Sequence, residues 1–359
     1  PNFINTKKFE NHENFEFVHG DLTDEVSINE LVKKIKPDYF INFAANSFVG
    51  CSWDMPMQVY DVNALGVIRC LEAIRKHNPT CRFYSAGSSE EFGDVDYSPQ
   101  DLEHPMKPRS PYGASKCSAH HIVKVYRESY GTYAVHGILF NHEGTKRGEE
   151  FVTRKITKGV SRIKHHLRTK ASIEVFEPIE LGNIYSKRDW SDSEDFVKGV
   201  WMMLHQDKFI ERTQKFSDNF AERWGLLEDN GCALGGSDVE GVAEEIVIEN
   251  LKDYILASGE SHSIKEFIEI AFKEADIFGS WVETSGQPYL TKYVMGDDKY
   301  SPLVVVNPDF YRPAEVDILT GDSSLIREEL GWKPEITFDQ LVKKMVRFDL
   351  DTYAKKKEN

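Results

Sequence analysis

The chain has 359 residues, of which 40% are hydrophobic and 29% charged. This composition is typical of a globular protein with two closely associated domains, and it excludes global disorder. No stretch approaches the ~18 apolar residues that a membrane-spanning helix needs. Fifty-nine acidic against forty-four basic side chains give a formal charge of −15. The negative electrostatic field of such a chain repels nucleic acids and anionic bilayers, so a phosphate-bearing ligand needs a local basic site.

Short runs of β-branched and aromatic residues alternate with helical patterns over the first part of the chain. The alternation predicts βαβ units and an α/β fold with a doubly wound parallel sheet of Rossmann type. We expect strands at 15–18, 39–44, 82–86 and 133–140. We expect helices at 27–36, 57–76 and 111–131. A capping box of Ser27 and Glu30 should open the first. The last should begin at Ser110 and Pro111 and end with Gly131 as its C-cap.

The second half of the sequence is less regular and is interpreted as a smaller, interleaved α/β domain that caps the first, the substrate domain by the family resemblance given below. We expect a strand at 254–257 and helices at 152–164, 191–205, 263–275, 322–330 and 337–348, with Ser191 and Glu194 as a capping box. The expected division is therefore 1–150 and 151–359, with 184–258 partly returning to the first domain. Residues 208–251 are acidic and contain a Gly-Gly-Ser turn, which indicates an insertion.

Cysteine and histidine spacing gives no sign of a metal or disulfide site. Five cysteines are widely spaced, odd in number and never in a CxxC arrangement. This pattern predicts a reducing, cytoplasmic setting. The adjacent pairs His120–His121 and His165–His166 cannot share one face of a helix, so we expect no metal site there.

Tyr112 and Lys116 lie four residues apart, and hence on one face of the helix that begins at Pro111. The spacing alone is weak, because Tyr353 and Lys357 repeat it in the charged C-terminal segment. The context is more informative. A Ser-Ser-Glu run at 88–90 follows the strand expected at 82–86, and ligands of open α/β sheets bind beyond the carboxyl ends of the strands.

Each of these residue types has a chemical reason to be there. A tyrosine with an ordinary pKa near 10 is a poor base, but a cation one helical turn away, with a nicotinamide ribose beside it, would lower that pKa. Ser88 can orient a substrate hydroxyl. The Glu90 carboxylate can take a carbon-bound proton made acidic by a new neighbouring ketone, which leads to water elimination. The alternative is that Glu90 is a surface carboxylate beside Glu91.

Eight segments, in order along the chain, carry a resemblance to a known family. They read GDLTD at 20–24, FYSAGSSEEFG at 83–93, PRSPYGASK at 108–116, GILFNHE at 137–143, FVTRKI at 151–156, LGNIYSKRDW at 181–190, YRPAEV at 311–316 and GWKP at 331–334. Together they resemble the extended short-chain dehydrogenase/reductases, and among these the GDP-mannose 4,6-dehydratase family. The resemblance implies NADP as cofactor, GDP-mannose as substrate and a homo-oligomer, either a dimer or a tetramer, with no nucleic acid or membrane partner.

The resemblance also implies a role for particular residues. The expected catalytic residues are Ser88, where the family usually has Thr, with Glu90, Tyr112 and Lys116. The expected cofactor-binding residues are Asp21, Leu22, Phe43, Ala44, Ala45, Asn46, Ser47, Tyr112, Lys116, His142 and Arg147. The expected substrate-binding residues are Asn141, Val152, Lys155, Leu181, Gly182, Arg188, Arg312 and Glu315.

One departure from the family pattern concerns the N-terminal side. The family begins with a strand and a Gly-rich turn that hold the pyrophosphate, and no GxxGxxG precedes Asp21. By the family's layout roughly 40 to 50 residues are expected to be missing, and a chain beginning at Pro1 is expected to be poorly stable and to bind NADP weakly. Two other readings stay open: another NDP-sugar dehydratase or epimerase, and a catalytically silent sugar-nucleotide-binding protein.

Overall fold

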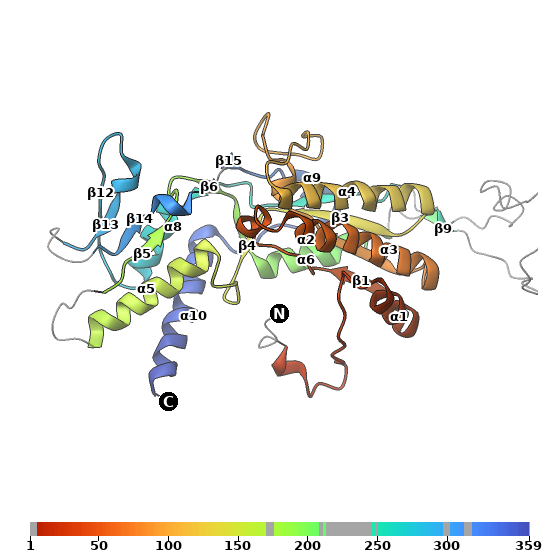
Figure 1. Cartoon of the computed structure of the whole chain (residues 1–359), viewed down its shortest axis with the longest axis horizontal. Helices are drawn as coiled ribbons and strands as arrows, with labels where there is room; N and C mark the ends of the chain where they lie inside the picture. The colour runs from red at the N-terminus through yellow and green to blue at the C-terminus, as the bar shows by residue number, and fades with distance from the viewer. Residues whose placement is uncertain are drawn as a thin grey trace, which may run out of the picture.

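The computed structural model describes residues 6–169, 176–207, 211–212, 246–247, 250–296, 302–311 and 318–358. A parallel sheet of four strands forms the first layered unit (Figure 1). Its order is β1 (Tyr39–Asn42), β2 (Arg82–Ala86), β3 (Ala134–Leu139) and β10 (Tyr254–Leu256). The four strands were all predicted within two residues of these ends, because each is a short apolar run bounded by polar or turn residues.

Helices cover both faces of this sheet, since successive strand residues point to opposite sides. Phe83 and Ala134 face a core built with α1 (Glu25–Ile35), α3 (Gly66–His77) and α4 (Pro111–Tyr130). Tyr84 and Val135 face a second core with α6 (Ser193–Met203) and α9 (Ser324–Leu330). The doubly wound α/β arrangement expected from the sequence is confirmed.

A second unit lies beside the first and has its own core (Figure 1). Its sheet has the order β12 (Ser280–Val282), β13 (Lys292–Val294), β14 (Val304–Val306) and β5 (Ile179–Leu181), antiparallel except for the β14–β5 pair. Three helices pack on it: α5 (Val152–Thr169), α8 (Ile264–Glu274) and α10 (Phe338–Glu358).

Short strand pairs connect distant parts of the chain. The strands β4 (Asn141–Glu143) and β7 (Trp190–Asp192) run parallel, and β6 (Lys187–Arg188) lies between β11 (His262–Ser263) and β15 (Ile318–Leu319). A further pair joins β8 (Glu211–Arg212) and β9 (Ile246–Val247). Because β4 follows β3 after a single residue, the chain passes directly from the central sheet toward the second unit.

Four expectations from the sequence are wrong. Residues 15–18 form no strand, because no described strand lies alongside to accept their backbone hydrogen bonds, and Phe17 is 46% exposed. Asp24, not Ser27, caps α1 by accepting from the backbone N–H groups of Val26 and Ser27. Likewise Asp192, one residue beyond Ser191, caps α6. In both helices the N-cap residue is an aspartate, whose charged carboxylate is a stronger hydrogen-bond acceptor for the free N–H groups than a serine hydroxyl.

The fourth concerns the helix expected at 57–76. It divides into α2 (Pro56–Tyr60), a π-helical turn at Asp61–Leu65 and α3. Apolar spacing alone could not show this break, since a π turn adds one residue without changing the composition.

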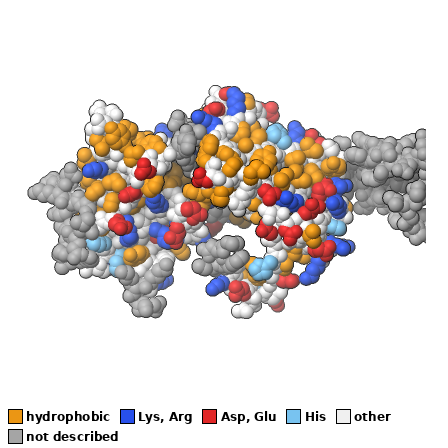
Figure 2. Space-filling view, viewed as in Figure 1, with side chains coloured by type: hydrophobic (Ala, Val, Ile, Leu, Met, Phe, Trp, Pro, Cys, Tyr) orange, Lys and Arg blue, Asp and Glu red, His pale blue; other side chains and the backbone are white. Residues whose placement is uncertain are grey.

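The described surface carries charges of both signs, while hydrophobic side chains gather over β12 and β13 at one end (Figure 2). None of the described helices combines the length and apolar character that crossing a bilayer requires. Cys51, Cys70, Cys81 and Cys117 are free thiols, and Cys232 lies outside the described residues.

Candidate active site

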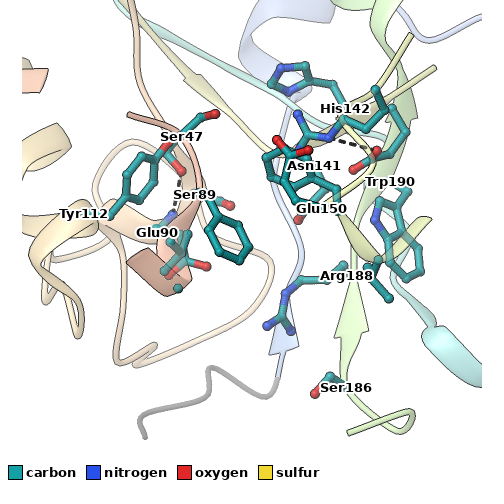
Figure 3. A pocket seen from close by; sticks show the side chains of 18 of the residues that line it. Ser47, Ser89, Glu90, Tyr112, Asn141, His142, Glu150, Ser186, Arg188 and Trp190 are labelled. Atoms are coloured by element: carbon teal, nitrogen blue, oxygen red, sulfur yellow. Dashed lines mark hydrogen bonds and ion pairs between the residues drawn. The ribbon is translucent and has the colours of Figure 1, made fainter. Parts of the chain in front are cut away.

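A cavity of about 620 Å³ lies beyond the carboxyl ends of β2 and β3, where the second unit closes it from the other side. Its size is that of a pocket for a small molecule or cofactor. Figure 3 shows Ser47, Glu90 and Tyr112 on one side, and Asn141, His142 and Arg188 across from them. The cavity is thus lined from both units.

The Ser-Ser-Glu run enters the cavity on a tight turn after β2. Ser88 has an extended backbone and caps the short 3₁₀ helix η5 (Ser89–Glu91), with its hydroxyl accepting from the backbone N–H of Glu90 at 3.3 Å. The Glu91 carboxylate reaches back to accept from the Ser88 backbone N–H at 2.7 Å. This closed capping box presents the Ser88 hydroxyl and the Glu90 carboxylate at the cavity wall.

Helix α4 supplies the other two expected catalytic residues. The Ser110 hydroxyl accepts from the backbone N–H of Gly113 at 3.0 Å, and Pro111 occupies the first turn, as the sequence predicted. This start places Tyr112 and Lys116 on one face, toward the cavity. The Lys116 ammonium donates to the Ala86 carbonyl at 2.7 Å and lies 5.9 Å from the Tyr112 ring centroid.

Burial controls the charge of both side chains. It raises the pKa of Tyr112 to about 12, against a hydrogen bond with Ser88 that lowers it. It lowers the pKa of Lys116 to about 8. In the chain by itself, loss of solvent outweighs the nearby cations. The lower tyrosine pKa that is expected with a nicotinamide ribose beside Tyr112 stays a prediction for the bound state.

Three of the expected cofactor-binding residues that follow β1 line the cavity: Phe43, Ala45 and Ser47. Two others, Ala44 and Asn46, do not line it, and they shape the loop through backbone hydrogen bonds to Asn42 and Asn63. Asp21 and Leu22 lie outside the cavity. The Asp21 carboxylate accepts from Thr23, and the Leu22 side chain packs in the core beside α1 and α3.

A residue that the sequence analysis missed supports this loop. Asn63 is buried in the π-helical turn, accepts from the Asn46 backbone N–H at 2.8 Å and donates to the Asn46 carbonyl at 3.2 Å. Its amide also donates to the Ser115 hydroxyl of α4 at 3.1 Å. Asn63 therefore joins the loop after β1 to the helix that carries Tyr112. Its position inside a predicted continuous helix gave no signal of this role.

His142 and Arg147, both expected to contact the cofactor, line the cavity next to each other on β4 and the loop that follows. Burial lowers the pKa of His142 to about 4, so the ring is neutral and its Nδ1 donates to the Phe140 carbonyl at 3.0 Å. Arg147 pairs with the buried Glu143 carboxylate at 3.2 Å and stacks on the Phe151 ring at 3.4 Å. These contacts hold the guanidinium at the cavity wall.

Most of the expected substrate-binding residues share this cavity. Lys155 lies over the Phe310 ring at 4.3 Å, and a Cβ on Gly182 would be only 2.6 Å from the Phe310 carbonyl oxygen, so only glycine permits this close approach. Arg312 and Glu315 lie outside the described residues. The expected substrate-binding residues that line the cavity are Asn141, Val152, Lys155, Leu181, Gly182 and Arg188.

Several lining residues were missing from the sequence-based set. Aromatic side chains are prominent among them, and Ser186 adds a buried hydroxyl with no hydrogen-bond partner among the described residues. A buried hydroxyl at a cavity wall that has no such partner is suited to hydrogen-bond a polar atom of a ligand. Trp190 also lines the cavity while stacking on Phe338. The other missed lining residues include Phe48, Trp53, Glu150, Phe151 and Tyr311.

The donors around the cavity fit a nicotinamide group beside a sugar diphosphate. Arg147, Lys155 and Arg188 provide cations in a chain whose net charge is −15, and diphosphates need such charge-assisted donors. The ring faces of Phe43, Phe48 and Trp53 offer flat apolar surface.

Comparison with known proteins agrees with this geometry. A family model described as GDP-mannose 4,6 dehydratase matches residues 2–222 and 238–345. The chain is 38% identical over 343 residues to GDP-mannose 4,6 dehydratase 1 of Arabidopsis thaliana, covering 94% of this chain and 75% of that protein. It is 34% identical over 346 residues to the Homo sapiens GDP-mannose 4,6 dehydratase, with 94% and 77% covered.

Solved structures with little sequence identity share the fold. RMD from Pseudomonas aeruginosa, complexed with NADPH, superposes with a TM-score of 0.67 at 20% identity, covering 97% of this chain and 94% of that one. DesIV, a dTDP-glucose 4,6-dehydratase from Streptomyces venezuelae, gives 0.69 at 17% identity, with 98% and 85% covered.

Proposed function

We propose, from the fact that this chain belongs to the GDP-mannose 4,6-dehydratase family, that it converts GDP-mannose to GDP-4-keto-6-deoxymannose. The observation that carries the proposal is that Glu90 and Tyr112 open into one cavity from separate segments. A simple dehydrogenation needs only the hydroxyl, the phenol and the lysine. The added carboxylate supplies the base that water elimination requires.

In the proposed reaction Tyr112 takes the proton of the C4 hydroxyl, and Ser88 orients that hydroxyl. The proposed cofactor is NADP, which accepts the C4 hydride when bound and returns it to C6. Lys116 holds the ribose and favours the phenolate. Since burial raises the pKa of Tyr112 to about 12, the phenol stays protonated until a positive charge approaches. The bound complex is therefore the state in which Tyr112 acts as a base.

Elimination is assigned to Glu90. Once C4 is a ketone, the C5 proton is acidic, and the Glu90 carboxylate removes it. The same group then delivers a proton to the C6 hydroxyl, which leaves as water. Hydride that bound NADP would give back to C6, together with a proton returned to C5 in balance with the one that Tyr112 took from the C4 hydroxyl, would complete the 6-deoxy sugar, so no net oxidation occurs.

The basic side chains are assigned to the phosphates. We propose that Lys155 and Arg188 bind the diphosphate of GDP-mannose and that Arg147 faces the cofactor phosphates. Asn141, Val152, Leu181 and Gly182 complete the proposed substrate site. Arg312 and Glu315, outside the described residues, keep their proposed roles from the family resemblance, as do Asp21 and Leu22 for the adenine end of the cofactor.

We also propose that residues 1–150 form the cofactor domain and 151–359 mainly the substrate domain, with 184–258 partly in the first. The insertion expected at 208–251 lies mostly outside the described residues. A homo-oligomer, dimer or tetramer, in the cytoplasm completes the proposal, and light scattering on the purified protein tests the oligomeric state.

The test of the function is incubation with GDP-mannose and NADP, followed by mass spectrometry of the sugar nucleotide. Loss of one water from the sugar nucleotide supports the dehydratase. An unchanged mass with altered stereochemistry would indicate an epimerase, and binding without conversion would indicate a silent binding protein.

A further inference from the structure

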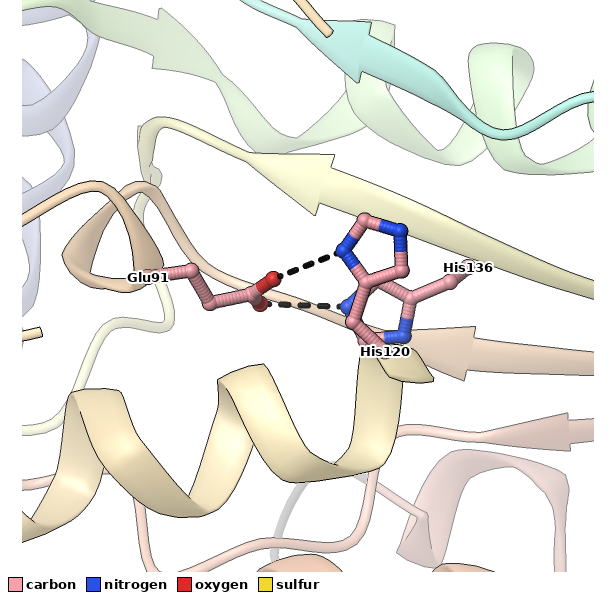
Figure 4. Close-up of side chains that lie close together, drawn as sticks. All are labelled: Glu91, His120 and His136. Atoms are coloured by element: carbon pink, nitrogen blue, oxygen red, sulfur yellow. Dashed lines mark hydrogen bonds and ion pairs between the residues drawn. The ribbon is translucent and has the colours of Figure 1, made fainter. Parts of the chain in front are cut away.

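Behind the catalytic turn, away from the cavity, lies a buried group of ionisable side chains: Glu91, His120, His136 and Asp253, here called the Glu91 cluster. The two carboxylate oxygens of Glu91 face one imidazole each, His136 Nε2 at 3.1 Å and His120 Nδ1 at 3.3 Å (Figure 4). The other His120 nitrogen, Nε2, lies 3.5 Å from Asp253. Glu91 and His136 are fully buried.

Three atoms of this cluster satisfy the distance requirement for a shared metal ion, since ligand atoms of Glu91, His120 and His136 lie within 4.8 Å of one another. The ring orientation argues against a shared metal: His136 is hydrogen-bonded to Glu91, and the His120–Glu91 contact is an ion pair. The two imidazoles stack at 14° with centroids 4.8 Å apart. A ring nitrogen binds a metal in the plane of its own ring, and stacked rings lie in separate planes. His120 lies on α4 and His136 on β3, so the spacing of adjacent histidines in the sequence gave no sign of this grouping.

The surroundings of His120 favour a charged ring. Asp253 and Glu91 flank it with negative charge, and Arg127 neutralises Asp253 through bonds of 2.8 and 2.9 Å. Against the effect of burial, the two carboxylates raise the pKa of His120 to about 9, while His136 and His120 lower the pKa of Glu91 to about 2. His136, by contrast, has its pKa lowered by burial. Other ionisable groups next to the cluster are Lys116, Cys117, Tyr84 and Tyr112, while the exposed His121 contacts only the His120 ring among the described interactions.

The cluster is in direct contact with the catalytic turn. Glu91 Oε1 accepts both from His136 and from the backbone N–H of Ser88. The packing leaves no room for adjustment, because a Cβ on Gly87 would be 2.2 Å from His136 Nε2 and 2.7 Å from Glu91 Oε1. His120 lies one helical turn beyond Lys116 on α4. The His120–Glu91 contact therefore ties the turn of Ser88 and Glu90 to the helix of Tyr112 and Lys116.

We propose that Glu91 is a positioning residue, held by the paired imidazoles of His120 and His136, which fixes Ser88 and Glu90 at the separation from Tyr112 that water elimination requires. The inference rests on the proposed function of the site. Glu91 touches no substrate atom in this account, and it acts through the Ser88 backbone. A substitution that removes the contacts of Glu91 should slow water elimination more than oxidation at C4. Only elimination needs Glu90 and Tyr112 to act on one sugar ring in sequence.

The test compares the wild type with Glu91→Gln, which keeps the shape but removes the charge, and with His120→Gln. His121→Gln is the matched control, because this neighbouring histidine is exposed and, among the described interactions, contacts the His120 ring but not Glu91. With GDP-mannose and NADP we expect Glu91→Gln to lower the rate of water loss about tenfold to a hundredfold. The absorbance of reduced nicotinamide and an undehydrated 4-keto sugar should accumulate, while KM changes little. His121→Gln should match the wild type.

Equal loss of both steps, or wild-type elimination in Glu91→Gln, would overturn the proposal. A stoichiometric transition metal in the purified protein, lost in Glu91→Gln, would overturn it in favour of a metal site. An NMR titration of ¹⁵N-labelled histidines separates the proposal from the proposed function, since it needs no turnover. We expect one imidazole to stay charged to about pH 8 in the wild type and to lose that property in Glu91→Gln. If no imidazole stays charged to this pH, the proposed cluster is contradicted even in an active enzyme. If a charged imidazole is present in an inactive protein, only the proposed function is refuted.

Discussion

The guanidinium of Arg127 and the carboxylate of Asp253 form a doubly hydrogen-bonded ion pair inside the protein, with nitrogen–oxygen distances of 2.8 and 2.9 Å. The same carboxylate accepts from the backbone N–H of His136 at 2.6 Å. Three segments, the end of α4, the strand β3 and the start of β10, are joined at this point. The ion pair therefore holds the frame on which the catalytic helix lies.

Replacing Asp253 with Asn should be strongly destabilising, because it leaves the Arg127 cation buried without its partner. Removing one member of a buried pair costs about 3–5 kcal/mol. Chemical denaturation should show this loss in the free energy of unfolding. Lys124→Gln, which breaks the exposed Lys124–Glu128 pair on the same helix, should cost less than about 0.5 kcal/mol. Similar losses in both variants would contradict the assigned importance of the buried pair.

The stability contributed by His120 should depend on pH. Its pKa is raised to about 9 in the folded chain, from about 6.5 when unfolded. The folded state therefore binds the proton more tightly, and this stabilisation is complete below pH ~6.5 and is lost as pH rises through ~9. The wild type should exceed His120→Gln in unfolding free energy by about 3 kcal/mol at low pH, with the difference shrinking toward pH ~10. A constant difference across this range would contradict a charged His120.

Glu90→Gln should separate the two halves of the reaction. The amide cannot accept the C5 proton, so we expect water loss to fall by about 10²-fold or more while oxidation at C4 continues. Rapid mixing with absorbance detection of the reduced cofactor would show its build-up. Glu150→Gln, at a lining carboxylate with no assigned proton transfer, is the comparison. Equal effects of the two substitutions would argue against the role of Glu90.

Lys116 should limit activity at alkaline pH. Burial lowers its pKa to about 8, so the ammonium loses its charge as pH rises through that value, and kcat/KM should fall there. Lys116→Arg keeps the charge at every accessible pH. The variant should be slower at neutral pH because the guanidinium does not fit the contact with Ala86. Its kcat/KM, however, should decline only at a higher pH than that of the wild type. An unchanged decline would assign it to another group.

Sequence patterns predicted the sheet and most helices because those signals are local. The strand of Arg82–Ala86 and the start of α4 at Ser110 and Pro111 depend on a few neighbouring residues. The strand expected at 15–18 failed because pairing depends on a partner elsewhere in the chain. The cap at Asp24 was missed because several polar residues nearby could have served.

The predicted site followed the same rule. The residues carried by motifs, such as Ser88, Glu90, Tyr112 and Lys116, line one cavity. The Glu91 cluster was not foreseen, because Glu91, His120 and Asp253 come from three distant segments and share no spacing signal. Trp53 and Ser186 were missed for a similar reason, since only folding brings their loops to the cavity.

The most direct test of the proposed chemistry is to supply GDP-mannose carrying deuterium at C4 and to locate that deuterium in the product. We predict a sugar nucleotide lighter by one water with the deuterium at C6, since the same hydride leaves and returns within one turnover. Retention of the water, or a product without deuterium at C6, would contradict the account.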